Sequence, residues 1–425
     1  MGRTLSVRLS HNWRHDAARF DDENLVSCAG LVPVMELAEQ TGLPDLLERH
    51  VVFRSERIRS GAANPTPKLT SIISGMASVL RRHLLALATR TDVPAGIAEQ
   101  AFVDIDSLLR PVYGHAKQGA SFGHTKIANR QVLRKGLSPL VTTISTRAAA
   151  PVLTGIRLRA GKTGSGKGAA SMLTEAITTA KTAGATTILC RGDSAFGNHK
   201  TITAVVKTGA QFSFVLTKTR PVLRAIGAIP EHAWTPARYP GAVLDPDTGE
   251  LISDAEVADI DYTAFAGTKH EITARLIVRR VRDRNHPDEL FPVWRYHPFF
   301  TNTTEPVTDA DITHRQHAII ETVFADLIDG PWAHLPSGLF AANAAWATLA
   351  AITHNLLRAA GTLTDHTHAV ARGATLRRHL INVPARITRP QGKQTLHLPT
   401  HWPRASRWKA LWDSTFTDHR RQVAA

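Results

Sequence analysis

The feature that most constrains the fold is a regular exchange of strand and helix patterns in the middle of the chain. Apolar and polar residues alternate at 102–106, as in a half-buried strand, and short apolar runs follow further along. Between these runs, apolar residues recur with helical spacing. Strands are expected at 102–106, 140–145, 152–158, 186–190 and 211–217, and helices at 168–183 and 200–207. The alternation predicts a layered α/β domain.

The expected succession of three strands, helix, strand, helix and strand is the order of a ribonuclease-H-like sheet. Helical patterns dominate residues 1–95, whereas 220–305 is rich in turns and strand patterns. We therefore expect an α/β protein with a ribonuclease-H-like catalytic core, a β-rich insertion and an N-terminal helical region. The predicted domains are a helical, candidate DNA-binding region at 1–95, the two parts of the core at 96–219 and 306–362, the insertion at 220–305 and a basic C-terminal region at 363–425.

The charge distribution indicates a polyanionic partner. The chain has 51 Lys and Arg against 36 Asp and Glu, a formal net charge of +15. Residues 107–174 contain eleven Lys or Arg and no acid, and residues 366–425 contain eleven against two Asp. Nucleic acid is the expected partner, because phosphate neutralisation drives such binding; the alternative is a basic enzyme with a small anionic substrate. In the C-terminal tail, Trp402, Trp408 and Trp412 favour anchoring on the core over stacking on bases.

Location is indicated by what the sequence lacks. No apolar run reaches the ~18–20 residues that span a bilayer. No apolar signal segment follows Met1, and the only cysteines are Cys28 and Cys190. These features predict a cytoplasmic protein with no membrane contact and no disulfide framework.

Three acidic residues stand at matched places in the predicted order of elements. Asp106 ends the first strand, Asp193 follows the fourth, and Glu321 lies in a helical segment. If the first and fourth strands are neighbours, both aspartates meet at one edge of the sheet. Asp104 shares a strand face with Asp106 and is the alternative first ligand. Converging carboxylates of this kind bind the paired divalent cations of phosphoryl transfer, and hard oxygen ligands suit Mg²⁺ or Mn²⁺.

Five short segments in a fixed order carry a family resemblance. They read FVDIDS at 102–107, GHAKQGASFG at 114–123, RGDSAF at 191–196, HRQHAIIETVFADL at 314–327 and HLPSGLFAANAAW at 334–346. Together they resemble bacterial insertion-sequence transposases, specifically the IS-four-like superfamily in its thirteen-eighty group. The resemblance covers roughly residues 95–415.

The resemblance implies a DDE transposase, which cuts DNA strands at the ends of a mobile element and joins them to target DNA. It assigns Asp106, Asp193 and Glu321 as the catalytic and metal-binding residues, with Mg²⁺ or Mn²⁺ as the cofactor. The implied partners are double-stranded DNA, both terminal inverted repeats and target, and a second copy of the chain, since two ends must be joined. The implied location is the bacterial nucleoid.

The chain departs from the superfamily pattern around the Glu helix. The Tyr, Arg and Lys found there at fixed spacings are replaced by His314, His317 and Ile328. The N-terminal region is also short, which places a candidate truncation between Gly75 and Val79. Two alternative functions therefore stay open: an impaired copy that acts as a DNA-binding protein, and a metal-dependent DNA nuclease that cuts without joining.

Basic residues beside the carboxylates are the candidate DNA contacts. The loop at 161–168 nearly matches a nucleotide-binding P-loop, but Gly168 stands where the Ser or Thr that holds Mg²⁺ is required. A loop that meets DNA phosphate, or a flexible connector, explains it better. Glu321 also shares a helix face with two histidines, which makes zinc binding an alternative. The candidate DNA contacts are Lys117, Lys126, Arg130, Lys135, Lys162, Lys167, His314 and His317.

Overall fold

The chain forms two compact units. The first comprises Met1–Ala95, Ala148–Val152 and Ala325–Ala425, and the second comprises Gly96–Arg147 and Leu153–Phe324. The computed structural model describes residues 15–20, 27–51, 66–114, 116–127, 130–237, 255–283 and 293–423. The domain boundaries expected from the sequence stay predictions, and the core segment expected at 306–362 is divided between the two units.

A nine-stranded mixed sheet is the framework of the second unit, in the order β11-β12-β13-β14-β10-β9-β3-β7-β8. Five of its strands are β3 (Ala101–Ser107), β7 (Leu140–Ser145), β8 (Val152–Arg157), β9 (Ile188–Gly192) and β10 (Gln211–Val215). β3, β9 and β10 are mutually parallel, and β7 runs antiparallel to β3. The carboxyl ends of the three parallel strands therefore lie at one edge of the sheet.

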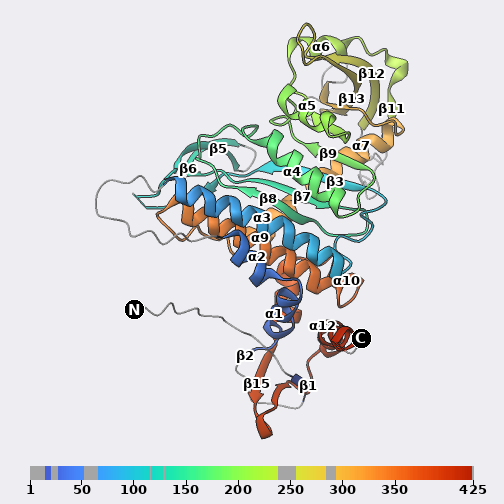
Figure 1. The fold of residues 1–425 in the computed structure, drawn as a ribbon. Coiled ribbons are helices and arrows are strands. Elements are labelled where there is room, and N and C mark those ends of the chain that lie inside the picture. The colour runs from blue at the N-terminus through green and yellow to red at the C-terminus, as the bar shows by residue number, and fades with distance from the viewer. Residues whose placement is uncertain are drawn as a thin grey trace. The chain divides into compact units, whose positions relative to one another are not determined.

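Two helices cross between these strands and cover the sheet (Figure 1). They are α4 (Ala169–Thr182) and α5 (His199–Lys207). α4 contacts β3, β7 and β9, and α5 contacts β10. β9 is buried along its whole length and β3 along all but its last two residues, as expected of strands covered on both faces.

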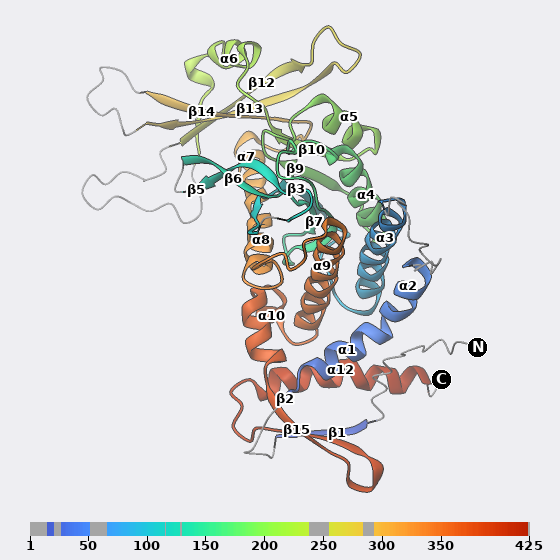
Figure 2. The same ribbon diagram turned by 90° about the vertical axis from the view of Figure 1, so that its left-hand side faces the viewer.

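The segment expected to be β-rich extends the same sheet. β12 (Ala255–Ala264), β13 (Ile272–Arg282) and β14 (Trp294–Thr301) form an antiparallel meander, and β14 pairs with β10. Figure 2 shows the three long strands side by side. Before them come α6 (Arg220–Gly227), a short 3₁₀ turn (Glu231–Ala233) and β11 (Thr235–Pro236).

A smaller sheet lies between β3 and β7 in the sequence. It contains β4 (Arg110–Pro111), β5 (Ser121–Ile127) and β6 (Arg130–Leu137) in the order β4-β6-β5. β5 and β6 pair as an antiparallel hairpin from Ser121↔Gly136 to Ile127↔Arg130. The sequence patterns did not predict this hairpin.

Helices build most of the first unit. They are α1 (Leu31–Gln40), α2 (Leu43–His50), α3 (Thr66–Arg90) and α9 (Phe340–Thr362). α3 packs against α9, whose buried face is rich in alanine. α3 runs without a break through Gly75 and Val79. In the described part of the chain, no helix has the length and apolar character needed to cross a membrane.

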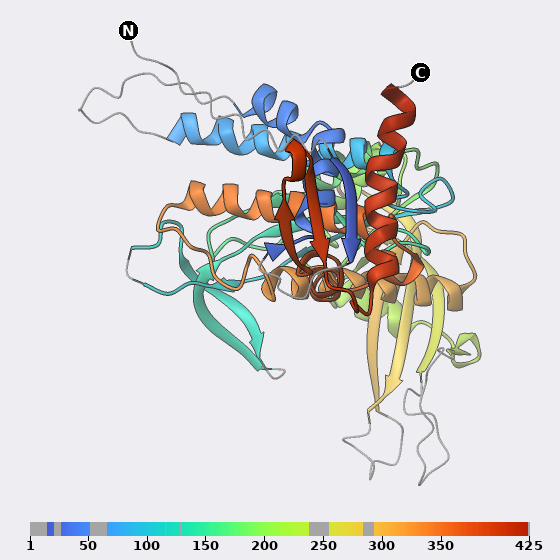
Figure 3. The ribbon, with the colours of Figure 1, turned by 90° about the horizontal axis from the view of Figure 1, so that it is seen from below.

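The C-terminal region adds a second layer to this unit. After α10 (His366–Ala369), α11 (Gly373–Leu376) and a π-helical turn (Arg377–Ile381) come β15 (Pro384–Thr388), a short turn (Pro390–Gly392), β16 (Gln394–Leu398) and α12 (Ala405–Val423). β1 (His15–Phe20) pairs with β16, and β2 (Ser27–Cys28) with β15 (Figure 3). Trp408 and Trp412 are buried in the core of this layer, and Trp402 packs against it. The prediction that the tail tryptophans anchor the tail is confirmed.

Candidate active site

Two of the predicted carboxylates lie at the ends of neighbouring parallel strands. The register pairs Asp104 with Arg191 and Ile105 with Gly192, so Asp106 and Asp193 are the next residues along the two strands. Asp106 is half-buried and accepts a hydrogen bond from the Ser107 amide at 2.6 Å. Asp193 is exposed and accepts one from the Ala195 amide at 2.9 Å.

The third carboxylate stands in the first turn of a helix that comes after the sheet in the chain. The helical segment expected around Glu321 is divided into α7 (Val307–Arg315), a 3₁₀ turn (Gln316–Ile319) and α8 (Ile320–Ile328). Glu321 is exposed at the start of α8. Its apolar neighbours Val323 and Phe324 are buried, so the carboxylate is directed away from the core.

The pKa of Asp106 responds to the other two predicted carboxylates. The pKa of Asp106 is raised to about 7, first by burial and then by the negative charges of Asp193, Glu321 and Asp104; the Ser107 amide opposes the rise. Because such effects fade with distance, Asp193 and Glu321 lie in the neighbourhood of Asp106, and we refer to Asp106, Asp193 and Glu321 as the acidic cluster. Such a cluster is unfavourable by itself, and a bound cation would relieve it.

The cluster suits a hard divalent cation by donor type. All three side chains offer carboxylate oxygens, which Mg²⁺ and Mn²⁺ prefer. Among the residues that the structure describes, no group of three or more His, Cys, Asp or Glu is spaced closely enough to enclose an ion. Mg²⁺ commonly retains several water ligands and binds through one or two carboxylates, so an open arrangement fits it better than it fits zinc.

Asp104, the alternative first ligand, is engaged elsewhere. Its two oxygens accept hydrogen bonds from Arg191 Nε at 2.7 Å and Nη2 at 2.9 Å. Both side chains are 1% exposed. A carboxylate whose two oxygens are held by a buried guanidinium is poorly suited to a metal ion, so the structure favours Asp106 over Asp104.

Arg191 also ties together the segments that carry the three acids. Besides Asp104 on β3, its Nη1 donates to the carbonyl of Thr313 on α7 at 2.7 Å. Its guanidinium stacks over the Phe102 ring at 4.2 Å. Arg191 and Asp104 each stand two residues before a predicted carboxylate, and Thr313 stands eight before Glu321. The sequence analysis missed this role, although the repeated two-residue spacing was its signal.

The histidines before Glu321 belong partly to the core. His314 is buried, stacks on Phe299 at 4.1 Å and shares a hydrogen bond of 2.8 Å between its Nδ1 and Ser213 Oγ. Burial and the charges of His317 and Arg191 hold its pKa well below the usual value. A neutral, buried imidazole brings no positive charge to DNA. His317 is half-buried, with Nδ1 2.8 Å from the His314 carbonyl.

The glycine-rich loop is closed around a buried arginine. Arg159 Nη1 donates to the carbonyls of Gly164, Ser165 and Lys167 at 3.4, 2.7 and 3.0 Å. Gly168 then begins α4 with φ of +87°, a conformation that favours glycine. The loop carbonyls therefore point at Arg159, unlike a P-loop, whose amides surround phosphate. Lys162 and Lys167 are exposed on its outer side.

The other predicted DNA contacts lie on or beside the β5–β6 hairpin. Lys117 precedes it and is half-buried, as is Lys135 on β6. Lys126 and Arg130 stand at the tip of the hairpin, but their side chains lie outside the described residues. A cavity of about 390 Å³ between this hairpin and the glycine-rich loop is lined by Ser107, His124 and Lys162 among others.

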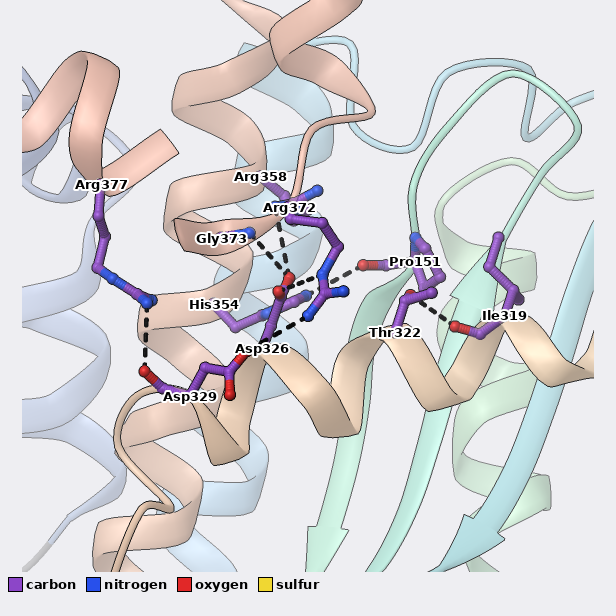
Figure 4. A network of polar contacts seen from close by, with 10 residues as sticks. All are labelled: Pro151, Ile319, Thr322, Asp326, Asp329, His354, Arg358, Arg372, Gly373 and Arg377. Atoms are coloured by element: carbon purple, nitrogen blue, oxygen red, sulfur yellow. Dashed lines mark hydrogen bonds and ion pairs between the residues drawn. The ribbon is translucent and has the colours of Figure 1, made fainter. Parts of the chain in front are cut away.

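A buried carboxylate fixes the far end of the Glu321 helix (Figure 4). Asp326 is buried and accepts hydrogen bonds from Arg372 Nε at 2.6 Å and the Gly373 amide at 3.0 Å. The guanidinium of Arg358, also buried, lies 3.8 Å away. Sequence reasoning missed this residue, whose signal was an acid next to the apolar stripe of α8. Its role is structural, because it compensates two arginines.

Comparisons with known proteins cover the part of the chain that contains the acidic cluster. A sequence profile of the family described as transposase DDE domain group 1 matches residues 87–415. No curated protein matches the chain. Among solved structures, the chain is similar to a piggyBac transposase in a synaptic complex with hairpin DNA, determined by cryo-electron microscopy. That match has 9% sequence identity and a TM-score of 0.36 and covers 93% of this chain and 71% of the other. A score this low supports no conclusion about function.

Proposed function

Because the chain belongs to the DDE transposase family, in its domain group 1, we propose that it cuts DNA strands at the ends of a mobile element and joins the freed 3′-hydroxyl ends to target DNA. The observation that carries the proposal is the acidic cluster at the edge of the sheet. Asp106 and Asp193 follow each other across paired strands, and both Asp193 and Glu321 raise the pKa of Asp106. Double-stranded DNA is the proposed partner, and a homodimer the proposed assembly.

We infer a ribonuclease-H-like core from the topology. The strands that come first to fifth along the chain are β3, β7, β8, β9 and β10, and their order in the sheet is β8-β7-β3-β9-β10. β9 and β10 run parallel to β3, and β7 runs antiparallel to it. This order places the first and fourth strands beside each other in the middle. The motif at 102–107 and those around Asp193 and Glu321 support a finer assignment to the insertion-sequence transposases of the IS-four-like superfamily and its thirteen-eighty group.

In the proposed site, Asp106, Asp193 and Glu321 hold Mg²⁺ or Mn²⁺. Bound divalent cations of this kind polarise a phosphoryl oxygen and lower the pKa of a coordinated water. The chain has two tasks of its own. Asp106 must lose its proton before it can act as a ligand, and the Arg191–Asp104 pair keeps β3, β9 and α7 in register.

The test is DNA cleavage and joining by the purified chain. A supercoiled plasmid with the coding region and its natural genomic flanks is incubated with Mg²⁺ and an unrelated target plasmid. The wild-type chain should nick at the element ends and produce joined molecules. Asp106→Asn, Asp193→Asn and Glu321→Gln should each reduce both reactions by at least about a hundredfold, as loss of a metal ligand does. Glu99→Gln, an exposed acid of the same unit, is the matched control. Full cleavage by Asp193→Asn would refute the site assignment.

Ile328 favours a second candidate function. It takes the place of a lysine that the superfamily pattern has seven residues after Glu321. A copy without this cation would bind element ends but nick them poorly, and would act as a DNA-binding regulator. End binding without metal-dependent nicking would support it, and Ile328→Lys should then restore nicking. Nicking without any joined product would instead indicate a nuclease.

A further inference from the structure

A second cavity opens beside the acidic cluster in the same unit. Its volume is about 520 Å³, within the range of roughly 300–1,000 Å³ typical of ligand sites. Its lining includes Ser194, the residue after Asp193, and His317, four residues before Glu321. The wall is built from residues just beyond β10, from β13 and β14, and from the end of α7. We call it the basic cavity.

Three Lys or Arg side chains and one Asp line the basic cavity. Lys218 follows β10, Arg279 lies on β13, and Arg315 and the acid, Asp311, lie on α7. His297 also lines the cavity. Its pKa is lowered first by burial and then by the positive charges of Arg279, Lys218, Arg295 and Arg315. Each of these cations therefore lies close enough to His297 to act on its charge, and Lys218, Arg279 and Arg315 also line the cavity.

The exposed cations of the basic cavity can reach a bound anion. Lys218 Nζ donates to the Tyr296 carbonyl at 3.2 Å and keeps further donors for an anion. Lys218 and Arg315 are exposed, so a ligand can reach both side chains. The half-buried Tyr296 contributes an aromatic ring to the same lining. Cations beside an aromatic ring suit a nucleic-acid strand, whose phosphates and bases alternate.

We propose that the basic cavity binds the phosphodiester backbone of one DNA strand next to the bond on which the acidic cluster acts. The inference rests on the proposed function, since it places the strand relative to that cluster. None of the candidate DNA contacts expected from the sequence, apart from His314 and His317, lies in this cavity. It would guide the strand over the β12–β14 side of the sheet, whereas the predicted lysines lie around the β5–β6 hairpin.

Salt-dependent DNA binding tests the cavity without any cleavage. The probe is a fluorescein-labelled oligothymidylate of about 20 nucleotides, longer than one single-strand site, bound in EDTA. Each cation that neutralises a phosphate contributes about 0.7 to the slope of log Kd against log salt on a single strand. Lys218→Gln and Arg315→Gln should each lower the slope by about this amount.

Matched controls lie at the opposite edge of the sheet. Lys207→Gln, at the end of α5, and Arg147→Gln, just after β7, remove exposed cations there and should leave the slope unchanged. Equal slopes for cavity and control variants would overturn the proposal. The outcome is separable from the fate of the proposed function. Lost slope with no nicking by the wild-type chain would retain the cavity and reject the transposase chemistry, whereas nicking with unchanged slopes would do the reverse.

Discussion

Arg191 holds the segments that carry the acidic cluster. The three carboxylates at one sheet edge repel each other, so contacts between their backbone segments must offset this repulsion. The Arg191 guanidinium does this from the interior, through Asp104 on β3 and the Thr313 carbonyl on α7. Because the ion pair is buried, its net contribution to stability is small, but the loss of one partner is costly.

Arg191→Met should therefore separate folding from catalysis. The single change leaves Asp104 buried without its partner and should cost about 3–5 kcal/mol in unfolding free energy. Combining it with Asp104→Leu removes both charges and should recover most of that loss. The rate of metal-dependent nicking should stay low in the double variant, because the tie to α7 is gone. Urea unfolding and nicking rates are the measurements, and recovery of both would reduce the pair to a structural role.

Asp106 should make the metal-free protein less stable as pH rises. Its folded pKa is about 7, above the ordinary value of 3.8, so the folded state retains a proton that the unfolded state has lost. The stability from this group is complete below pH ~4 and is lost as pH rises towards 7, by on the order of 4 kcal/mol. Asp106→Asn should abolish the loss and raise the melting temperature in EDTA at pH 8. Mg²⁺ should stabilise the wild-type chain more than this variant, and an equal effect on both would place the ion elsewhere.

At the scale of elements, the sequence predicts strands and helices that show a clear apolar pattern. It does not predict contacts between residues far apart in the chain. The expected strand at 140–145 is β7, which is buried throughout, and the expected helix at 200–207 lies within α5, which buries one face. The β5–β6 hairpin escaped prediction since its half-exposed strands carry basic residues on both faces. The place of Asp106 could be predicted, because it depends on strand order. The partner of Asp104 could not, because Arg191 lies 87 residues away.

The loop before α4 shows how geometry overrides a sequence pattern. Gly168→Ser completes the P-loop pattern, yet it should not create nucleotide binding, because the loop carbonyls are held by Arg159. The left-handed φ of +87° should instead make the change cost about 1–2 kcal/mol. Gly164→Ser, where an added Cβ meets no atom within 4 Å, is the control and should change stability little. Urea unfolding and binding of a fluorescent ATP analogue measure both effects. ATP binding by Gly168→Ser would restore the interpretation of this loop as a nucleotide site.

At the scale of the whole molecule, the two units differ in the balance of their buried titrating groups. The first holds two histidines that burial keeps neutral. His83 shares a hydrogen bond with Thr41 Oγ1 at 2.9 Å, His354 Nε2 lies 3.2 Å from the Pro151 carbonyl, and each has a pKa lowered to about 4. The second unit holds one such histidine, His314, whose pKa is also lowered, together with Asp106, whose pKa is raised. Acid therefore destabilises the first unit, whereas in the second unit the effects of His314 and Asp106 oppose each other.

Lowering the pH from 7.5 to 5 should destabilise the first unit more than the second, because Asp106 offsets the loss from His314 in the second. His83 and His354 take up protons near pH 6.5 in the unfolded state and only near pH 4 in the folded state. Between pH 7.5 and 5, acidification therefore lowers the free energy of unfolding by about 2 kcal/mol for each. Asp106 gains its proton in the folded state first, which adds about 2–3 kcal/mol in the absence of metal. Hydrogen exchange measured by mass spectrometry, corrected for intrinsic rates, reports both units in one experiment. His354→Gln should flatten the response of α9, whereas Asp106→Asn should leave the loss from His314 unopposed and enlarge the response of β3. Equal changes in the two units, unaltered by either variant, would mean that they unfold as one body.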